Sequence, residues 1–66
     1  LAHLKVENQT FVEITHMSLK PFLTQKADGI IGLGWKTLAT PGTVPFFYNM
    51  MRQKLVNQNV FTFYMN

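Results

Sequence analysis

The sequence predicts a mainly β fold with one short helix. Alternating apolar and polar residues indicate strands over 4–15 and 60–65. The apolar run 29–32 begins and ends with glycine, which is typical of a strand that is buried on both faces. Only the stretch 44–55 carries apolar residues at helical spacing. The expected fold class is therefore all-β with one short helix.

Length and composition indicate that this stretch belongs to a larger core. The chain has 66 residues, of which 47% are hydrophobic and 14% aromatic, and it has no cysteine. A domain of this size buries only ~60% of the surface that its unfolded chain exposes. Small domains usually add disulfides or metals, and neither is evident in this sequence. We therefore expect a piece of a domain rather than a complete one.

The charge distribution argues against two classes of partner. Six Lys and Arg face three Asp and Glu, and the basic residues are scattered along the chain. Nucleic-acid binders concentrate basic residues on one face, so we expect no nucleic-acid partner. No apolar run approaches the ~20 residues of a membrane span, and the first residues lack the pattern of a signal peptide. We therefore also expect no membrane partner.

The first predicted strand is expected to bury one face. One alternation phase is apolar: Leu4, Val6, Val12 and Ile14. The other phase is polar: Lys5, Glu7, Gln9, Glu13 and Thr15. Asn8-Gln9 interrupts the apolar face, which favours a bend or bulge there. Pro21 then ends the connection over 17–21, and 22–24 is expected to be briefly extended.

The second half of the chain is expected to contain the helix and the last strand. Residues 33–40 read as a turn with a short helical loop. Thr43 or Val44 is expected to cap a helix whose first position is Pro45, where the missing N–H costs nothing. The helical stripe consists of Val44, Phe46, Phe47, Met50, Met51 and Leu55. In the last strand, Phe61, Phe63 and Met65 share one face.

The familiar cofactor and metal patterns are not matched. The glycines in 29–34 are spaced G-x-x-G-x-G, whereas the dinucleotide fingerprint is G-x-G-x-x-G, so a tight buried turn is favoured. His3 and His16 lack cysteine or carboxylate neighbours and predict no metal site. Asn8-Gln9-Thr10 fits the N-glycosylation sequon, which matters if the chain is secreted. We expect neither a cofactor nor a metal.

The carboxylates do not suggest a catalytic pair. Hydrolysis by two acids needs them close enough to share a proton. The chain offers Glu7 and Glu13 in the exposed phase of the first strand, and Asp28 before the apolar run. Asp28 is therefore expected to be a structural carboxylate, hydrogen-bonded to neighbouring backbone.

Four segments, in this order, resemble the pepsin-like aspartic proteases, particularly the cathepsin D-like branch. The segments are VENQTFVEIT, KADGIIGLGW, TVPFFYNMMRQKLV and NVFTFYM. Each motif alone is weak, but four in register are specific. The resemblance extends from one end of the chain to the other.

The resemblance implies that 1–66 is the later part of the N-terminal lobe of the bilobal β-barrel fold, with no complete independent domain. The family's catalytic aspartates lie in D-T-G or D-S-G triplets, and neither occurs here, so the resemblance implies no catalytic residue in this stretch. It maps Phe22, Ala27 and Ile30 to walls of the substrate pockets on the amino side of the cleaved bond. The family usually has an aromatic residue where Ala27 stands. Gly32 would lie beside the catalytic loop.

The resemblance implies an endopeptidase that cleaves between bulky apolar residues at acidic pH, in a lysosomal or secreted setting. Its partners would be a peptide or protein substrate and the remainder of the same polypeptide. One alternative is a non-catalytic pepsin-like protein that binds peptides or a protein partner. Another is a retroviral-type homodimer, which would need a D-[TS]-G triplet in each chain. Two such triplets in the flanking sequence would favour the endopeptidase.

Overall fold

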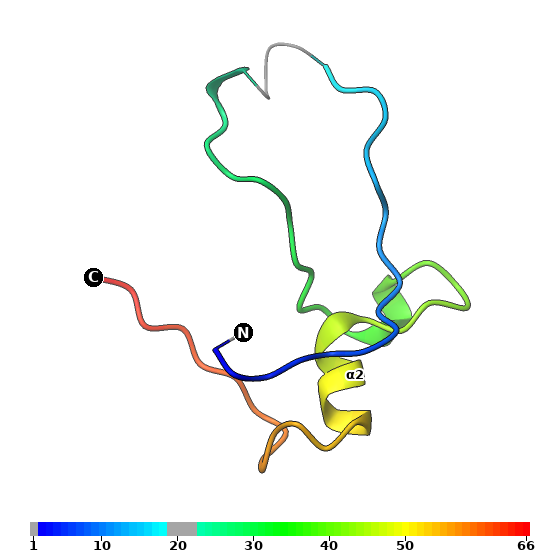
Figure 1. Ribbon diagram of the computed structural model, residues 1–66, viewed down its shortest axis with the longest axis vertical. Coiled ribbons are helices and arrows are strands. Elements are labelled where there is room, and N and C mark those ends of the chain that lie inside the picture. Colours follow the sequence, from blue (N-terminus) through cyan, green and yellow to red (C-terminus); the bar gives the residue numbers. More distant parts are fainter. Residues whose placement is uncertain (1, 19–22) are drawn as a thin grey trace.

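The computed structural model describes residues 2–18 and 23–66 (Figure 1). The 3₁₀ helix η1 spans Lys36–Leu38 and the α-helix α2 spans Phe46–Arg52. Apart from Leu23 and Thr24, which are helical, the other described residues are extended or turn-like, and no strand forms within the described ranges. The expected all-β fold is thus not observed in this chain, whereas the short helix and the helical loop over 33–40 are confirmed.

Helix α2 begins one residue later than the sequence predicted. Pro45 is its N-cap, with extended backbone angles of φ −60° and ψ 156°, rather than its first helical residue. Thr43 instead belongs to the preceding turn, because its hydroxyl donates a hydrogen bond to the Thr40 carbonyl at 2.6 Å. Proline fits this cap position because its ring fixes φ near the observed value and it has no N–H to satisfy.

The end of α2 has a defined capping motif. Lys54 adopts the left-handed conformation with φ 57°. The Lys54 N–H donates to the Met51 carbonyl at 3.1 Å, and the Leu55 N–H donates to the Met50 carbonyl at 2.9 Å. This pair of bonds is the Schellman arrangement, in which two otherwise unpaired helix carbonyls are satisfied. The motif turns the chain sharply after Arg52 and sends it back along the helix.

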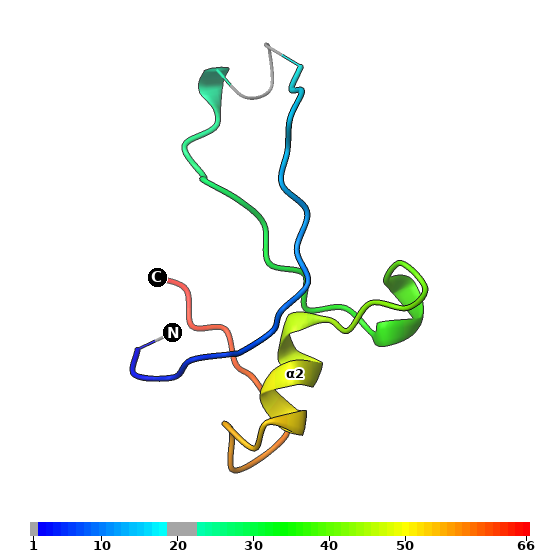
Figure 2. The same cartoon turned by 45° about the vertical axis from the view of Figure 1, so that its right-hand side comes forward.

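The small core lies in the middle of α2. Asn49 is 1% exposed and Met50 is 5% exposed, and they are the buried residues of the described chain. Figures 1 and 2 show the N-terminal segment crossing α2. Leu4 and Val6 are half-buried there, as the alternation predicted. The predicted bend is also present, since Asn8 has φ 57°.

Away from α2 the predicted buried faces are exposed. Val12 is 87% exposed and Ile14 is 58% exposed, although both were expected to face a core. Ile30, expected in a strand buried on both faces, is 90% exposed, and Ile31 is 59% exposed. These segments have extended backbone but no pairing neighbour among residues 2–18 and 23–66, and a strand exists only where a second strand accepts its hydrogen bonds. Leu23 and Thr24 are helical rather than extended.

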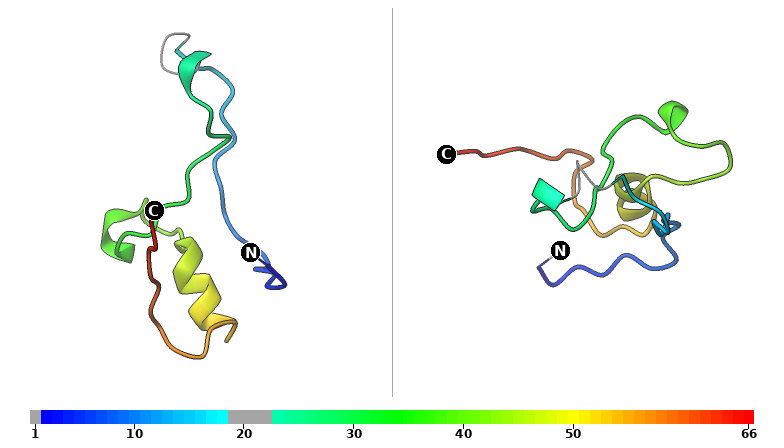
Figure 3. Two further views of the ribbon diagram at one scale, coloured as in Figure 1. Left: turned by 90° about the vertical axis from the view of Figure 1, so that its left-hand side faces the viewer. Right: turned by 90° about the horizontal axis from the view of Figure 1, so that it is seen from above.

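The overall dimensions are those of an open structure. The radius of gyration is 14.3 Å, whereas a compact domain of this length has about 11 Å. The accessible surface is 6681 Å², whereas a folded monomer of this mass exposes about 4,300 Å². Figure 3 shows the long loop and the C-terminal segment extending away from α2 on separate paths. Within the described ranges no helix is both long and apolar enough to cross a membrane.

Candidate functional site

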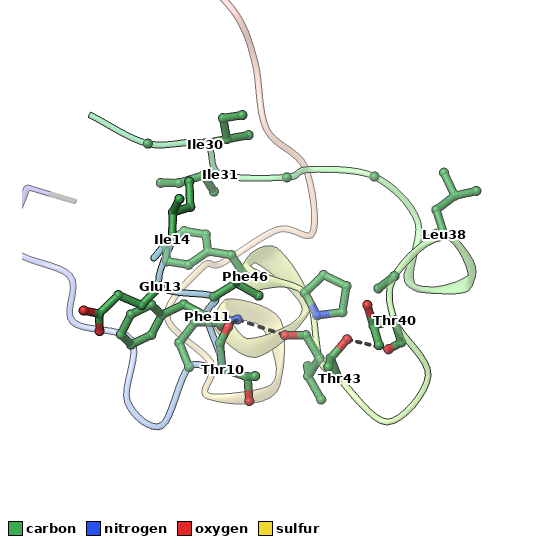
Figure 4. Close-up of a pocket in the computed structure, with 18 of the residues that line it drawn as sticks. Thr10, Phe11, Glu13, Ile14, Ile30, Ile31, Leu38, Thr40, Thr43 and Phe46 are labelled. Atoms are coloured by element: carbon green, nitrogen blue, oxygen red, sulfur yellow. Dashed lines mark hydrogen bonds between the residues drawn. The ribbon is translucent and has the colours of Figure 1, made fainter. Parts of the chain in front are cut away.

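The surface has an open cavity of about 1140 Å³. It is lined by residues within three segments, 9–17, 25–35 and 38–46 (Figure 4). In Figure 4, Ile30 and Ile31 point to opposite sides of the backbone, as successive residues of an extended chain do. The cavity is bordered by extended backbone that forms no strand pairing among the described residues, which is the kind of edge that can accept another strand.

Two of the three predicted pocket-wall residues lie in this cavity. Ala27 and Ile30 both line it, and both side chains are exposed. Phe22 lies outside the described residues. The structure places Ala27 and Ile30 on one open surface, and their role as walls of a substrate pocket stays a prediction.

The two carboxylates that line the cavity do not form a pair. Glu13 and Asp28 both contribute to its surface and both are exposed. No hydrogen bond joins them within the described ranges. The expectation that Asp28 is hydrogen-bonded to neighbouring backbone is wrong for this chain, because the extended backbone on either side presents no turn of N–H groups to its carboxylate. The described residues also contain no group of three or more His, Cys, Asp or Glu that could hold a metal.

The close backbone approach expected at Gly32 is not made by the described chain. A Cβ placed on Gly32 would meet no heavy atom within 4 Å, and the same holds for Gly29. The neighbour expected beside Gly32 is a catalytic loop that this stretch does not contain. The tight packing at Gly32 therefore stays a prediction for the longer protein.

A chain of amide hydrogen bonds fixes one end of the cavity wall. The Asn49 Nδ2 donates to Gln9 Oε1 at 2.6 Å, and the Gln9 Nε2 donates to the Val44 carbonyl at 3.0 Å. The Arg52 Nη2 donates to Asn49 Oδ1 at 2.7 Å. These bonds tie the first segment to α2 and to the residue before its proline cap. The alternation assigned Gln9 to the exposed face, which is wrong because its side chain is half-buried in this network.

A second amide anchors the first segment one turn further along. The Glu7 N–H donates to Gln53 Oε1 at 3.0 Å, and the Gln53 Nε2 donates to the Glu7 carbonyl at 2.7 Å. The side-chain amide of Gln53 thus satisfies both backbone groups of Glu7, as a neighbouring strand would. Sequence reasoning missed this contact and the role of Asn49; the available signal was an asparagine beside the apolar stripe of the predicted helix.

A smaller hollow of about 420 Å³ lies on another side of α2. It is lined by Leu33, Gly34, Trp35, Phe47, Tyr48, Met51, Asn59 and Phe61. The Phe47 and Phe61 rings meet edge to face with centroids 5.1 Å apart, and Phe61 meets Phe63 in the same way at 6.0 Å. The second contact agrees with the predicted shared face of the last segment. The Lys36 N–H donates to the Tyr48 hydroxyl at 3.0 Å and joins η1 to α2.

Comparison with known proteins shows which family this chain belongs to. The family model for eukaryotic aspartyl protease matches residues 1–66. Cathepsin D of Canis lupus familiaris is 44% identical over 66 residues, which cover 100% of this chain and 16% of that protein. Human cathepsin D is 41% identical over 66 residues, again 100% of this chain and 16% of that protein.

A plant protein matches nearly as well. Procardosin-B of Cynara cardunculus is 43% identical over 63 residues, which cover 96% of this chain and 12% of that protein. No solved structure matches the chain. The chain therefore spans about a sixth or less of the length of these relatives. Because the family model covers every residue and the relatives match throughout, the chain belongs to the eukaryotic aspartyl protease family.

Proposed function

We propose that residues 1–66 form the later part of the N-terminal lobe of an aspartic endopeptidase that cleaves peptide bonds between bulky apolar residues at acidic pH. The observation that carries the proposal is the family match over the whole chain. Both catalytic aspartates are supplied by other parts of the polypeptide, since this stretch has no D-[TS]-G triplet. The role of this segment is scaffold and pocket wall.

The exposed apolar surface supports the scaffold role. Phe11, Val12, Ile30 and Trp35 are each at least 75% exposed, and all four line the open cavity. Soluble proteins rarely expose contiguous apolar patches of this kind without a partner. The partner we assign is the remainder of the same polypeptide, whose strands would pair with the extended segments and cover these side chains.

The chemistry follows from two carboxylates that share a proton. One carboxylate activates a water molecule while the other polarises the peptide carbonyl. Ala27 and Ile30, together with Phe22, would contact the substrate side chains on the amino side of the cleaved bond. No resident cofactor or metal is needed for this reaction. A lysosomal or secreted location is suggested by the names of the cathepsin D relatives, and plant relatives are also similar.

The proposal is tested with the full-length protein that contains this stretch. We expect acid-dependent cleavage of a peptide between two bulky apolar residues, inhibited by pepstatin, and no cleavage by the 66-residue chain alone. Peptide binding without cleavage by the full-length protein would instead favour the non-catalytic alternative. Pepstatin-sensitive cleavage by the isolated chain would contradict the assignment of both aspartates to other parts of the polypeptide.

A further inference from the structure

The bend at Asn8 carries a modification signal that the peptidase role does not use. A sequon needs serine or threonine two positions after an asparagine. Of the four asparagines in this sequence that have a residue at that position, only Asn8 is followed by serine or threonine there. The sequence there is Asn8-Gln9-Thr10, and the middle residue is not proline, so the sequon is complete. We propose that Asn8 carries an N-linked glycan in the intact protein.

The local structure presents Asn8 outward. Its neighbours on both sides are held against α2, Glu7 through the Gln53 amide and Gln9 through Asn49. Asn8 itself is exposed and has φ 57°, a left-handed conformation that asparagine tolerates better than most residues. The bend therefore exposes the Asn8 side chain to solvent, while Glu7 and Gln9 are held by hydrogen bonds to Gln53 and Asn49.

The third residue of the sequon is also exposed. Thr10 is exposed, and the hydrogen bond that it accepts, from Gln9 Nε2 at 2.9 Å, goes to its carbonyl rather than to its hydroxyl. The hydroxyl is the group that the sequon requires at this position. Both functional groups of the sequon thus stand clear of the network that ties this segment to α2.

The glycan is transferred to Asn8 from a lipid-linked oligosaccharide donor. The Asn8 amide nitrogen forms a bond to the anomeric carbon of a lipid-diphosphate-linked oligosaccharide. The bond from that carbon to the diphosphate oxygen breaks, and the lipid diphosphate leaves with the electron pair. The amide proton passes to a base of the host transferase. The glycan is bulky, so the complete lobe must leave Asn8 uncovered, whereas Thr10, which lines the cavity, is needed only at the transfer step.

The inference rests on the secretory route in the proposed function, and the experiment supplies that route independently. The full-length protein is expressed in eukaryotic cells behind a heterologous signal peptide, purified from the medium and digested with trypsin. Trypsin cleaves after Lys5 and Lys26 but not after Lys20, because Pro21 follows it. The tryptic peptide that contains Asn8 therefore spans residues 6–26. Enzymatic glycan release should convert Asn8 to aspartate in this peptide, which mass spectrometry detects at the single residue.

Three variants make the test specific. Asn8→Gln and Thr10→Ala should both lose the modification. Each secreted variant should therefore migrate faster on a denaturing gel than the parent, by the apparent mass of one glycan. Thr10→Ser keeps the hydroxyl and should retain it. Peptidase activity is not needed for this readout, so failure of the catalytic proposal would leave it interpretable. Recovery of peptide 6–26 from the secreted parent with Asn8 unmodified throughout would overturn the proposal.

Discussion

Single polar side chains determine how the first segment of this chain meets α2. Asn49 is the most buried residue described, and it both donates to Gln9 and accepts from Arg52. A buried amide group without a hydrogen-bond partner lowers the stability of the fold. A single residue that forms hydrogen bonds with two neighbours therefore contributes more to stability than one that forms a single bond. The attachment of the first segment therefore depends on Asn49, together with the Gln53 amide that pairs with Glu7.

Replacing Asn49 should weaken the lobe measurably. In the full-length protein, Asn49→Ala removes both hydrogen bonds and leaves Gln9 Oε1 and the Arg52 guanidinium without this partner. We expect a loss of about 1–3 kcal/mol in the free energy of unfolding. The exposed Asn57→Ala serves as the matched control and should change that free energy by less than about 0.5 kcal/mol. Equal effects of the two variants in denaturant unfolding would show that the network contributes nothing particular.

Ala27 provides a residue-scale test of substrate contact. Where the family usually has an aromatic ring, this chain has a methyl group, which leaves room for a larger substrate side chain. In the full-length enzyme, Ala27→Phe should shift preference from Phe towards Ala on the amino side of the cleaved bond. A difference of one to three kcal/mol, about 10-fold to 200-fold in the ratio of kcat/KM values, is the size expected for such a change.

The control for this test is the adjacent residue. Lys26 is exposed and does not line the cavity, so Lys26→Gln should leave the ratio of kcat/KM for paired Phe and Ala peptides unchanged. If Ala27→Phe also leaves the ratio unchanged, Ala27 does not contact that part of the substrate, and its placement in the pocket wall is wrong.

At the scale of elements, α2 and the loop that contains η1 could be predicted from the sequence, whereas the strands could not. Helix α2 closes its hydrogen bonds within seven residues and ends in a local capping motif, so the spacing of its apolar residues is enough to predict it. The segments 4–15, 29–32 and 60–65 have the alternation or apolar content of strands. Their hydrogen bonds need partners distant in sequence, and among the described residues those partners are not present.

The same distinction explains which site residues could be predicted. Ala27 and Ile30 are assigned by matching motifs to a family; both line one cavity, and their contact with substrate stays a prediction. The pairing of Gln53 with Glu7 spans 46 positions and follows no periodicity, so no pattern within either segment indicates it. The alternation wrongly predicted that Gln9 is exposed, for a similar reason. Alternation predicts which side of the segment a residue faces, but it does not predict that Asn49 of α2 lies there as a hydrogen-bond partner.

At the scale of the whole molecule, an open shape and an apolar surface support the proposal that other parts of the protein complete the extended segments. Ile30 and Tyr64 are each 90% exposed, and the radius of gyration is 14.3 Å. Burying such side chains contributes about 1.5–3 kcal/mol each when they leave water entirely. The isolated chain should therefore be at best partly folded, and its stability should come from the rest of the lobe.

Amide hydrogen exchange over 29–32 and 60–65, compared between the full-length protein and the isolated 66-residue chain, tests this account most directly. We predict that these amides exchange at least about 100-fold more slowly in the full-length protein, because strands from the rest of the lobe accept their hydrogen bonds there. In the isolated chain they should exchange at nearly the rate of an unfolded peptide. Equal, rapid exchange in both proteins would show that no strand partner completes these segments and would contradict the placement of this chain inside a lobe.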